Sequence, residues 1–117
     1  MRVTRIIADL HVPDVATAKA FYTGFLGLSV EEFDLGWVAR CTSPNTGADL
    51  QLVSRDATAP EVPAISVVTD DVDGAHAEAR ELGYEIVHPL TTEAWGVRRF
   101  FLRAPDGTVI NVVDHRD

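Results

Sequence analysis

The sequence predicts an α+β fold of two βαβββ modules, with curved mixed sheets that enclose a cavity and helices on the outer face. The chain repeats itself: Asp14-Val15 recurs 57 residues later as Asp71-Val72, and Leu26-Gly27 recurs 56 residues later as Leu82-Gly83. Each half shows a strand-like run, a helical run and three further strand-like runs. A half of about 55 residues cannot bury both faces of its sheet alone. We therefore expect the uncovered faces to line a cavity.

The first module spans about residues 1–56 and opens with an alternating strand at 3–12. One parity of this strand is apolar, which predicts the side that faces a helix; it comprises Ile6, Ala8, Leu10 and Val12. Pro13 breaks the strand, Asp14 can cap a helix, and Gly27 can end that helix. Three strands are expected to follow, at 28–33, 37–42 and 49–54.

The second module spans about residues 62–117 and follows the Pro-containing stretch 55–63, the one candidate linker within a single domain of residues 1–117. Its helix is expected from a cap at Asp70-Asp71 to a stop at Gly83. Its strands are expected at 64–69, 84–87, 97–102 and 108–113. The segment 89–96 is predicted to be a loop that carries Trp95.

Composition excludes several classes of function. The chain has 117 residues, 46% of them hydrophobic, and a net charge of −8. An acidic surface repels phosphate backbones, so we expect no nucleic-acid partner. No apolar run approaches the length of a membrane span, and Cys41 is the only cysteine. The sequence is typical of a cytoplasmic protein with no membrane partner.

The polar parity of the strands indicates a ligand-binding face. Among the polar residues expected on the side turned away from the helices, we take five as candidate ligand contacts: Asp9, His11, Gln51, Ser66 and Asn111. Such a scattered set suits the orientation of a small organic ligand. Trp37 and Trp95 each lie beside a glycine and either pack on the core or cover the ligand. Arg98 and Arg99 are expected to point to opposite faces, and we assign Arg99 to the ligand side. The alternative is that these arginines pair with Glu93 or Asp106.

The chain resembles the vicinal oxygen chelate superfamily, which groups glyoxalase I, bleomycin-resistance proteins and extradiol dioxygenases. The resemblance covers essentially the whole chain and rests on short strings in matching order: Pro13-Asp14-Val15, Phe21-Tyr22, Phe25-Leu26-Gly27-Leu28, Thr69-Asp70-Asp71-Val72, Leu82-Gly83 and Phe100 to Gly107. Metal enzymes of this superfamily take ligands, usually His and Glu, from four strands. The matching positions here are Ile7, Gln51, Ala64 and Asn111. This departure implies no metal and no other cofactor.

Two functions follow as hypotheses. The first is metal-independent binding of a small molecule, similar to bleomycin-resistance proteins that sequester an antibiotic; the acidic balance suits a cationic guest. The alternative is a glyoxalase-like enzyme of the lyase, isomerase or dioxygenase type, either metal-free or with a shifted metal site. Its catalytic candidates are Asp9 and His11, because a His beside a carboxylate can act as a general base. The resemblance also implies a homodimer.

Overall fold

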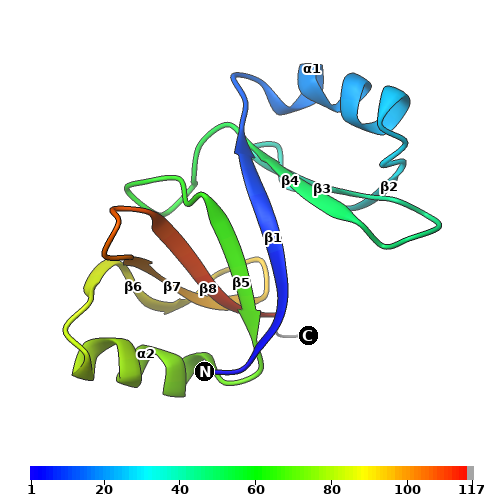
Figure 1. Cartoon of the computed structure of the whole chain (residues 1–117). Coiled ribbons are helices and arrows are strands. Elements are labelled where there is room, and N and C mark those ends of the chain that lie inside the picture. The colour runs from blue at the N-terminus through cyan, green and yellow to red at the C-terminus, as the bar shows by residue number, and fades with distance from the viewer. Residues whose placement is uncertain (116–117) are drawn as a thin grey trace. The chain divides into compact units, whose positions relative to one another are not determined.

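The computed structural model describes residues 1–115 of the chain (Figure 1). Its elements, in order, are β1 (Val3–His11), α1 (Val15–Lys19), the π-helix η1 (Ala20–Phe25), β2 (Val30–Asp34), β3 (Val38–Thr42), β4 (Asp49–Val53), β5 (Ile65–Thr69), α2 (Val72–Glu81), β6 (Glu85–Thr92), β7 (Val97–Arg103) and β8 (Val109–His115). Each half has the predicted order of one strand, one helical segment and three strands, which confirms the α+β fold class. None of the helices in this described part is long and apolar enough to cross a membrane.

The chain divides into two compact units. Residues 7–58 form one, which we call the α1 unit, and residues 1–6 with the chain from Ala59 onward form the other, the α2 unit. In the α1 unit the strand order is β2-β3-β4-β1, antiparallel except for the parallel pair β4 and β1. In the α2 unit the first residues of β1 lie beside β5, and the order β5-β8-β7-β6 follows. There β5 and β8 are parallel and the other two pairs are antiparallel, so both sheets are mixed.

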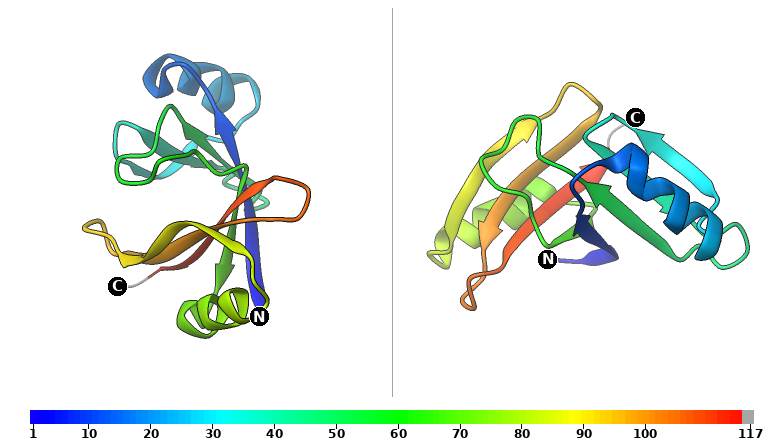
Figure 2. Two further views of the ribbon diagram at one scale, coloured as in Figure 1. Left: turned by 90° about the vertical axis from the view of Figure 1, so that its left-hand side faces the viewer. Right: turned by 90° about the horizontal axis from the view of Figure 1, so that it is seen from above.

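Helix α1 covers one face of the sheet in its own unit (Figure 2). The Asp14 side chain accepts a hydrogen bond from Thr17 N at 3.0 Å and caps the helix, as predicted. Gly27 then stops η1 with a φ of 72°, a conformation in which glycine carries no Cβ penalty. The core beneath the helix contains Val12, Val15, Ala39, Cys41 and Leu52.

The predicted packing of β1 against that helix is wrong for most of the strand. Ile6 is 60% exposed and Leu10 is 36% exposed, and Ala8 is exposed as well. Only Val12, at the end of the apolar parity, reaches the core under α1. The helix lies over β3 and β4, whose Ala39 and Leu52 fill the space beneath it. One side of β1 is therefore left apolar and uncovered.

Helix α2 covers its sheet in the same manner. Asp71 caps it through Gly74 N at 3.0 Å, and Gly83 follows its end with a φ of 80°. The core consists of Val72, Ala75, Ala79, Phe100 and Val112. Burial of these apolar side chains, at about 1.5–3 kcal/mol for each large one, stabilises the pairing of helix and sheet.

Strand β6 is longer than the sequence predicted. It runs to Thr92 and includes Pro89, with two irregularities in its pairing to β7, between Ile86 and His88 and between His88 and Thr91. The proline is accommodated because β6 is an edge strand of its sheet, where a missing backbone donor costs little. Of the predicted loop 89–96, only residues 93–96 lie outside a strand, so the connection that carries Trp95 is a tight turn.

Candidate functional site

A row of polar side chains crosses the sheet of the α1 unit on the face turned away from α1. The register pairs Asp9 with Gln51 and Gln51 with Arg40. Gln51 Nε2 donates to Asp9 Oδ1 at 2.5 Å, and Gln51 Oε1 accepts from Arg40 Nε at 3.1 Å and from Nη2 at 2.8 Å. All three side chains are buried. The structure thus joins two predicted site residues, Asp9 and Gln51, through an amide whose oxygen and nitrogen are both engaged.

The same row continues through the Arg40 guanidinium. Its Nη1 lies 3.2 Å from Glu32 Oε2, and Thr42 Oγ1 donates to Glu32 Oε1 at 2.8 Å. The guanidinium carbon lies 4.8 Å from the centre of the Phe33 ring, within cation–π distance. We call the set Asp9, Gln51, Arg40, Glu32 and Thr42 the Arg40 network. It holds two carboxylates and one guanidinium.

The other two site residues predicted in this unit lie at its edge. His11 is exposed, and its Nε2 lies 3.0 Å from the carbonyl oxygen of Ser54. Trp37 is half-buried, and its carbonyl oxygen accepts from Ser54 N at 3.0 Å. Asp9 and His11, the catalytic candidates, therefore have different hydrogen-bond partners.

A second row crosses the sheet of the α2 unit, again on the face opposite the helix. The register aligns Ser66 with Asn111, Asn111 with Phe101, and Phe101 with His88. Asn111 Nδ2 donates to Ser66 Oγ at 3.0 Å, so these two predicted site residues are in contact. Within the described chain, Asn111 Oδ1 and His88 Nε2 are buried and have no hydrogen-bond partner. This side of the sheet therefore contains an amide that is fixed by Ser66 and whose buried oxygen accepts no hydrogen bond.

Arg99 lies on this face in a buried ion pair with Glu93. Its Nε and Nη2 lie 2.8 Å and 2.7 Å from Glu93 Oε2, and its guanidinium carbon lies 5.1 Å and 4.8 Å from the ring centres of Trp95 and Phe101. His88 Nε2 is 3.4 Å from the same Glu93 oxygen, within ion-pair distance but without a hydrogen bond. Arg99 donates two hydrogen bonds to that oxygen, which has two lone pairs, so no lone pair is left for His88. Arg99 thus forms an ion pair with Glu93, which the sequence analysis gave as an alternative to a ligand contact, and it lies beside Trp95.

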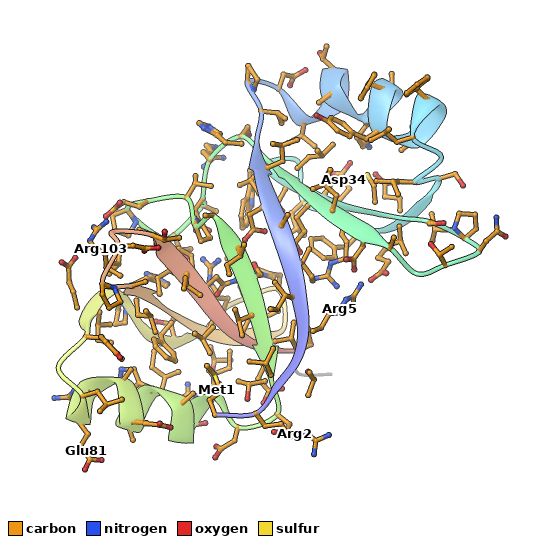
Figure 3. All side chains as sticks on the ribbon, viewed as in Figure 1. Met1, Arg2, Arg5, Asp34, Glu81 and Arg103 are labelled. Carbon is orange, nitrogen blue, oxygen red and sulfur yellow. The ribbon has the colours of Figure 1, made fainter. Side chains whose placement is uncertain are left out.

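Arg98 points to the opposite face of β7, as the alternation predicted. Its Nη2 lies 2.8 Å from Asp73 Oδ1 on α2, and this carboxylate raises the pKa of Arg98. Arg103, labelled in Figure 3, likewise forms exposed pairs with Glu61 at 2.7 Å and Glu85 at 3.2 Å. Solvent screens such pairs, so they orient side chains more than they stabilise the fold.

Sequence reasoning missed several members of the two polar rows. It did not assign Arg40, Glu32 or Thr42, and the strand expected at 84–87 ended before His88. His88 instead lies within β6, buried against Glu93 and 5.2 Å from the Phe101 ring centre. The strand parity of Arg40 relative to Cys41 would have placed Arg40 on the polar face. No sequence signal gives the His88–Glu93 contact, because it depends on the irregular pairing of β6.

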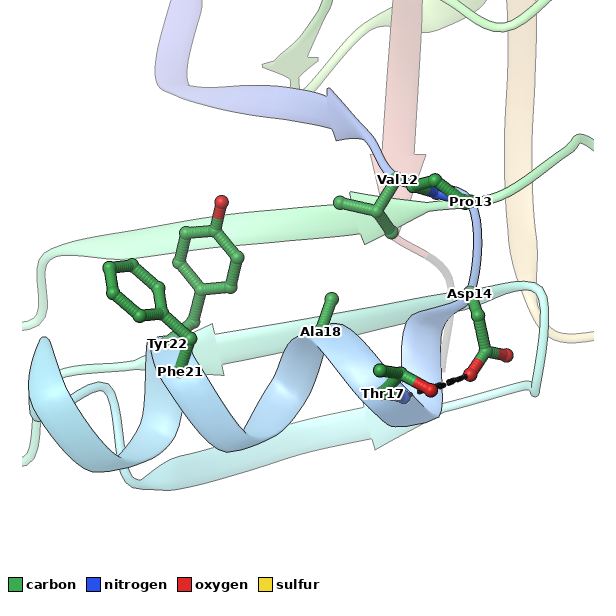
Figure 4. A pocket seen from close by; sticks show the side chains of 7 residues that line it. All are labelled: Val12, Pro13, Asp14, Thr17, Ala18, Phe21 and Tyr22. Atoms are coloured by element: carbon green, nitrogen blue, oxygen red, sulfur yellow. Dashed lines mark hydrogen bonds between the residues drawn. The ribbon is translucent and has the colours of Figure 1, made fainter.

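A pocket of about 350 Å³ lies on the helix side of the α1 unit (Figure 4). Its lining residues are Val12, Pro13, Asp14, Thr17, Ala18, Phe21 and Tyr22. Asp14, its one ionised group, caps the helix through Thr17, and these hydrogen bonds lower the Asp14 pKa. The pocket therefore combines an apolar wall with a carboxylate that is already engaged.

Comparison with known proteins places the chain in a family. Residues 4–112 match the profile of the glyoxalase/bleomycin resistance protein/dioxygenase superfamily. The chain belongs to this superfamily. No curated protein sequence matches the chain.

Solved structures of this glyoxalase-type fold are similar over nearly the whole chain. A methylmalonyl-CoA epimerase from Mycobacterium tuberculosis has a TM-score of 0.71 at 21% identity, covering 98% of this chain and 90% of its own. A superfamily member from Vibrio splendidus 12B01 has a TM-score of 0.70 at 14% identity, covering 94% and 97%. A Legionella pneumophila protein described as an NAD-dependent benzaldehyde dehydrogenase has a TM-score of 0.75 at 18% identity, covering 96% and 100%. At these identities the likeness shows the fold.

The donor atoms at the superfamily's metal positions do not suit a divalent ion. Ile7 and Ala64 have no side-chain lone pair, and Ile7 is fully buried. Gln51 has its oxygen bonded to a guanidinium, which repels a cation. Among residues 1–115, no group of three or more His, Cys, Asp or Glu side chains is placed to hold a metal ion. The residues present do not fit the metal that the superfamily implies.

Proposed function

We propose that this glyoxalase-type chain binds a small, planar organic molecule without a metal ion, in the manner of bleomycin-resistance-type sequestration. The observation that carries the proposal is Asn111. Its amide is fixed by Ser66 and its Oδ1 is buried without a partner in the described chain. An unpaired buried acceptor costs about 1–3 kcal/mol, which a donor on a ligand would recover. The proposed contact is therefore an N–H or O–H of the ligand with Asn111 Oδ1.

The charge and the aromatic groups support a planar, cationic guest. The chain carries a net charge of −8, which attracts cations. In the α2 unit the Trp95 and Phe101 rings already accept a guanidinium on their faces. Rings of this kind also attract other cations. An antibiotic with a cationic, planar part has this chemistry.

The test is a thermal-shift screen of planar cationic compounds, followed by titration of tryptophan fluorescence. A ligand that binds only the native state raises the melting temperature by mass action. For a confirmed ligand, Asn111→Leu should weaken binding by about 1–3 kcal/mol through the lost acceptor. Trp95→Ala should weaken it by about 0.5–1.5 kcal/mol beyond the lost contact area. Phe25→Ala, a change at an aromatic ring that is 81% exposed on η1, is the matched control. If the wild type and all three variants bind the ligand with equal affinity, the ligand does not bind at Asn111 and Trp95.

A second candidate function, metal-free acid–base catalysis, is favoured by the contact of His88 with Glu93. A buried imidazole 3.4 Å from a carboxylate, with no hydrogen bond on its Nε2, can exchange a proton with a bound molecule. Asp9 and His11, the candidates from the sequence, have Gln51 and the Ser54 carbonyl as partners instead. The two functions differ in turnover. If the protein is an enzyme, His88→Gln should abolish conversion of its substrate. If the protein only binds its ligand, no product forms and His88→Gln should leave the ligand affinity unchanged.

We also propose a homodimer in which a second copy covers the apolar side of β1. Ile6 is 60% exposed, Leu10 is 36% exposed, and Ala8 lies exposed between them. An exposed apolar row is a common mark of a protein interface. The chain has a net charge of −8, but this row of side chains is uncharged. Charge repulsion between two copies is therefore lowest when these rows face each other.

A further inference from the structure

We infer that the Arg40 guanidinium occupies oxygen donors in the α1 unit that could otherwise bind a divalent metal ion. Its guanidinium lies between Gln51 Oε1, at 2.8 Å from Nη2, and Glu32 Oε2, at 3.2 Å from Nη1. The residue is 5% exposed, and the Phe33 ring lies 4.8 Å from the guanidinium carbon. The positive charge of this face is therefore covalently attached to β3.

The groups around the guanidinium are oxygen donors of the kind that hard cations bind. Gln51 and Glu32 contact it directly, Asp9 contacts the Gln51 amide at 2.5 Å, and Thr42 contacts Glu32 at 2.8 Å. Calcium, magnesium and manganese ions select carboxylate, amide and hydroxyl oxygens. Asp9 is buried and the Glu32 side chain is 32% exposed, so at least the Asp9 carboxylate needs a nearby positive charge, since a buried charge without a partner is costly.

Arg40 keeps a free cation out by occupying the donor atoms. The lone pairs of Gln51 Oε1 face two N–H groups of the same guanidinium, at 3.1 Å and 2.8 Å. A metal ion could reach this oxygen only by displacing a buried, paired and stacked arginine. Arg40 is thus a specificity-determining residue, which acts by excluding metal. The inference rests on the metal-free part of the proposed function and is independent of the organic ligand.

The consequence is that removal of the guanidinium should create a cation site that the natural chain lacks. We would compare the wild type with Arg40→Ala and Arg40→Met, in chelator-treated buffer and after addition of CaCl₂ or MnCl₂, with NaCl at equal ionic strength as the salt control. Arg98→Ala is the matched control. Arg98 is also paired with a carboxylate, at 2.8 Å, but the side chain of this partner, Asp73, is 56% exposed. The readouts are the melting temperature and the count of bound Mn²⁺ by electron paramagnetic resonance.

We expect Arg40→Ala to melt below the wild type in chelator and to gain about 5 °C or more with millimolar Ca²⁺. Wild type and Arg98→Ala should show no gain beyond that in NaCl. Arg40→Met, which keeps a long apolar side chain on β3, should bind Mn²⁺ at least about tenfold more tightly than the wild type. If Arg40→Ala folds only after addition of Ca²⁺, that result supports the inference. If Arg40→Ala is unfolded in both buffers, the test is the Mn²⁺ binding of Arg40→Met.

Two results would overturn the account in different ways. A folded Arg40→Met that binds no more Mn²⁺ than the wild type would refute the role of Arg40 and leave metal-free ligand binding intact. A wild-type chain that holds one Mn²⁺ per molecule would refute both this inference and the metal-free part of the proposed function.

Discussion

The buried ion pair of Glu93 with Arg99 gives the sharpest prediction about the polar face of the α2 unit. The side chains of Glu93 and Arg99 are 4% and 5% exposed, and Arg99 Nη2 lies 2.7 Å from Glu93 Oε2. Glu93→Gln keeps the shape and an acceptor oxygen but removes the negative charge. Breaking one partner of a buried pair costs about 3–5 kcal/mol. We expect the lower end, about 3 kcal/mol, because the amide oxygen can still accept one hydrogen bond.

The assay is urea unfolding followed by far-ultraviolet circular dichroism. The matched control is Asp73→Asn, which removes the charge from the pair of Asp73 with Arg98. The side chain of Asp73 is 56% exposed, so solvent screens that pair and its loss should shift the urea midpoint far less. The slope of each transition should stay unchanged, which shows that the midpoint shift reports stability. If Glu93→Gln unfolds at the same urea concentration as Asp73→Asn, the buried pair does not stabilise this face.

Three further predictions concern pH, the thiol and assembly. Burial lowers the pKa of His76 below its ordinary 6.5 beside the Phe100 ring, so the unfolded chain binds the proton more readily. The contribution of neutral His76 to the free energy of unfolding is therefore complete above about pH 6.5 and is lost as the pH falls. His76→Gln should thus reduce the change in urea midpoint between about pH 7.5 and pH 5.5. Burial likewise raises the pKa of the Cys41 thiol, so a disulfide reagent should react slowly at neutral pH and quickly in urea; equal rates would show that the thiol is accessible. Sedimentation should give twice 12.8 kDa, and Ile6→Glu should give 12.8 kDa; a wild-type monomer would contradict the dimer.

The repeat and the strand alternation predicted most of the fold because they are local properties of the chain. Asp14 and Asp71 cap helices where the repeat placed them, and Gly27 and Gly83 have the positive φ that a helix stop requires. Alternation also placed Gln51 on the side opposite α1. These features depend on neighbouring residues alone.

The prediction failed where the structure depends on tertiary packing, which the local sequence pattern does not determine. The apolar parity of β1 predicted a helix over Ile6 and Leu10, but α1 packs on β3 and β4 instead. The irregular pairing of β6 moved His88 into contact with Glu93. Partners of buried charges such as Arg40 are likewise set by which strands are adjacent, and sequence spacing does not reveal that order.

The most direct test of metal-free binding is calorimetric titration of a ligand found in the thermal-shift screen, with and without a chelator. Elemental analysis of the same protein would count any bound ion. Because Ile7 and Ala64 supply no lone pair and Gln51 is bonded to Arg40, we predict the same affinity in both buffers and less than one metal ion per chain. Binding that disappears with the chelator and returns with a stoichiometric divalent ion would contradict the account.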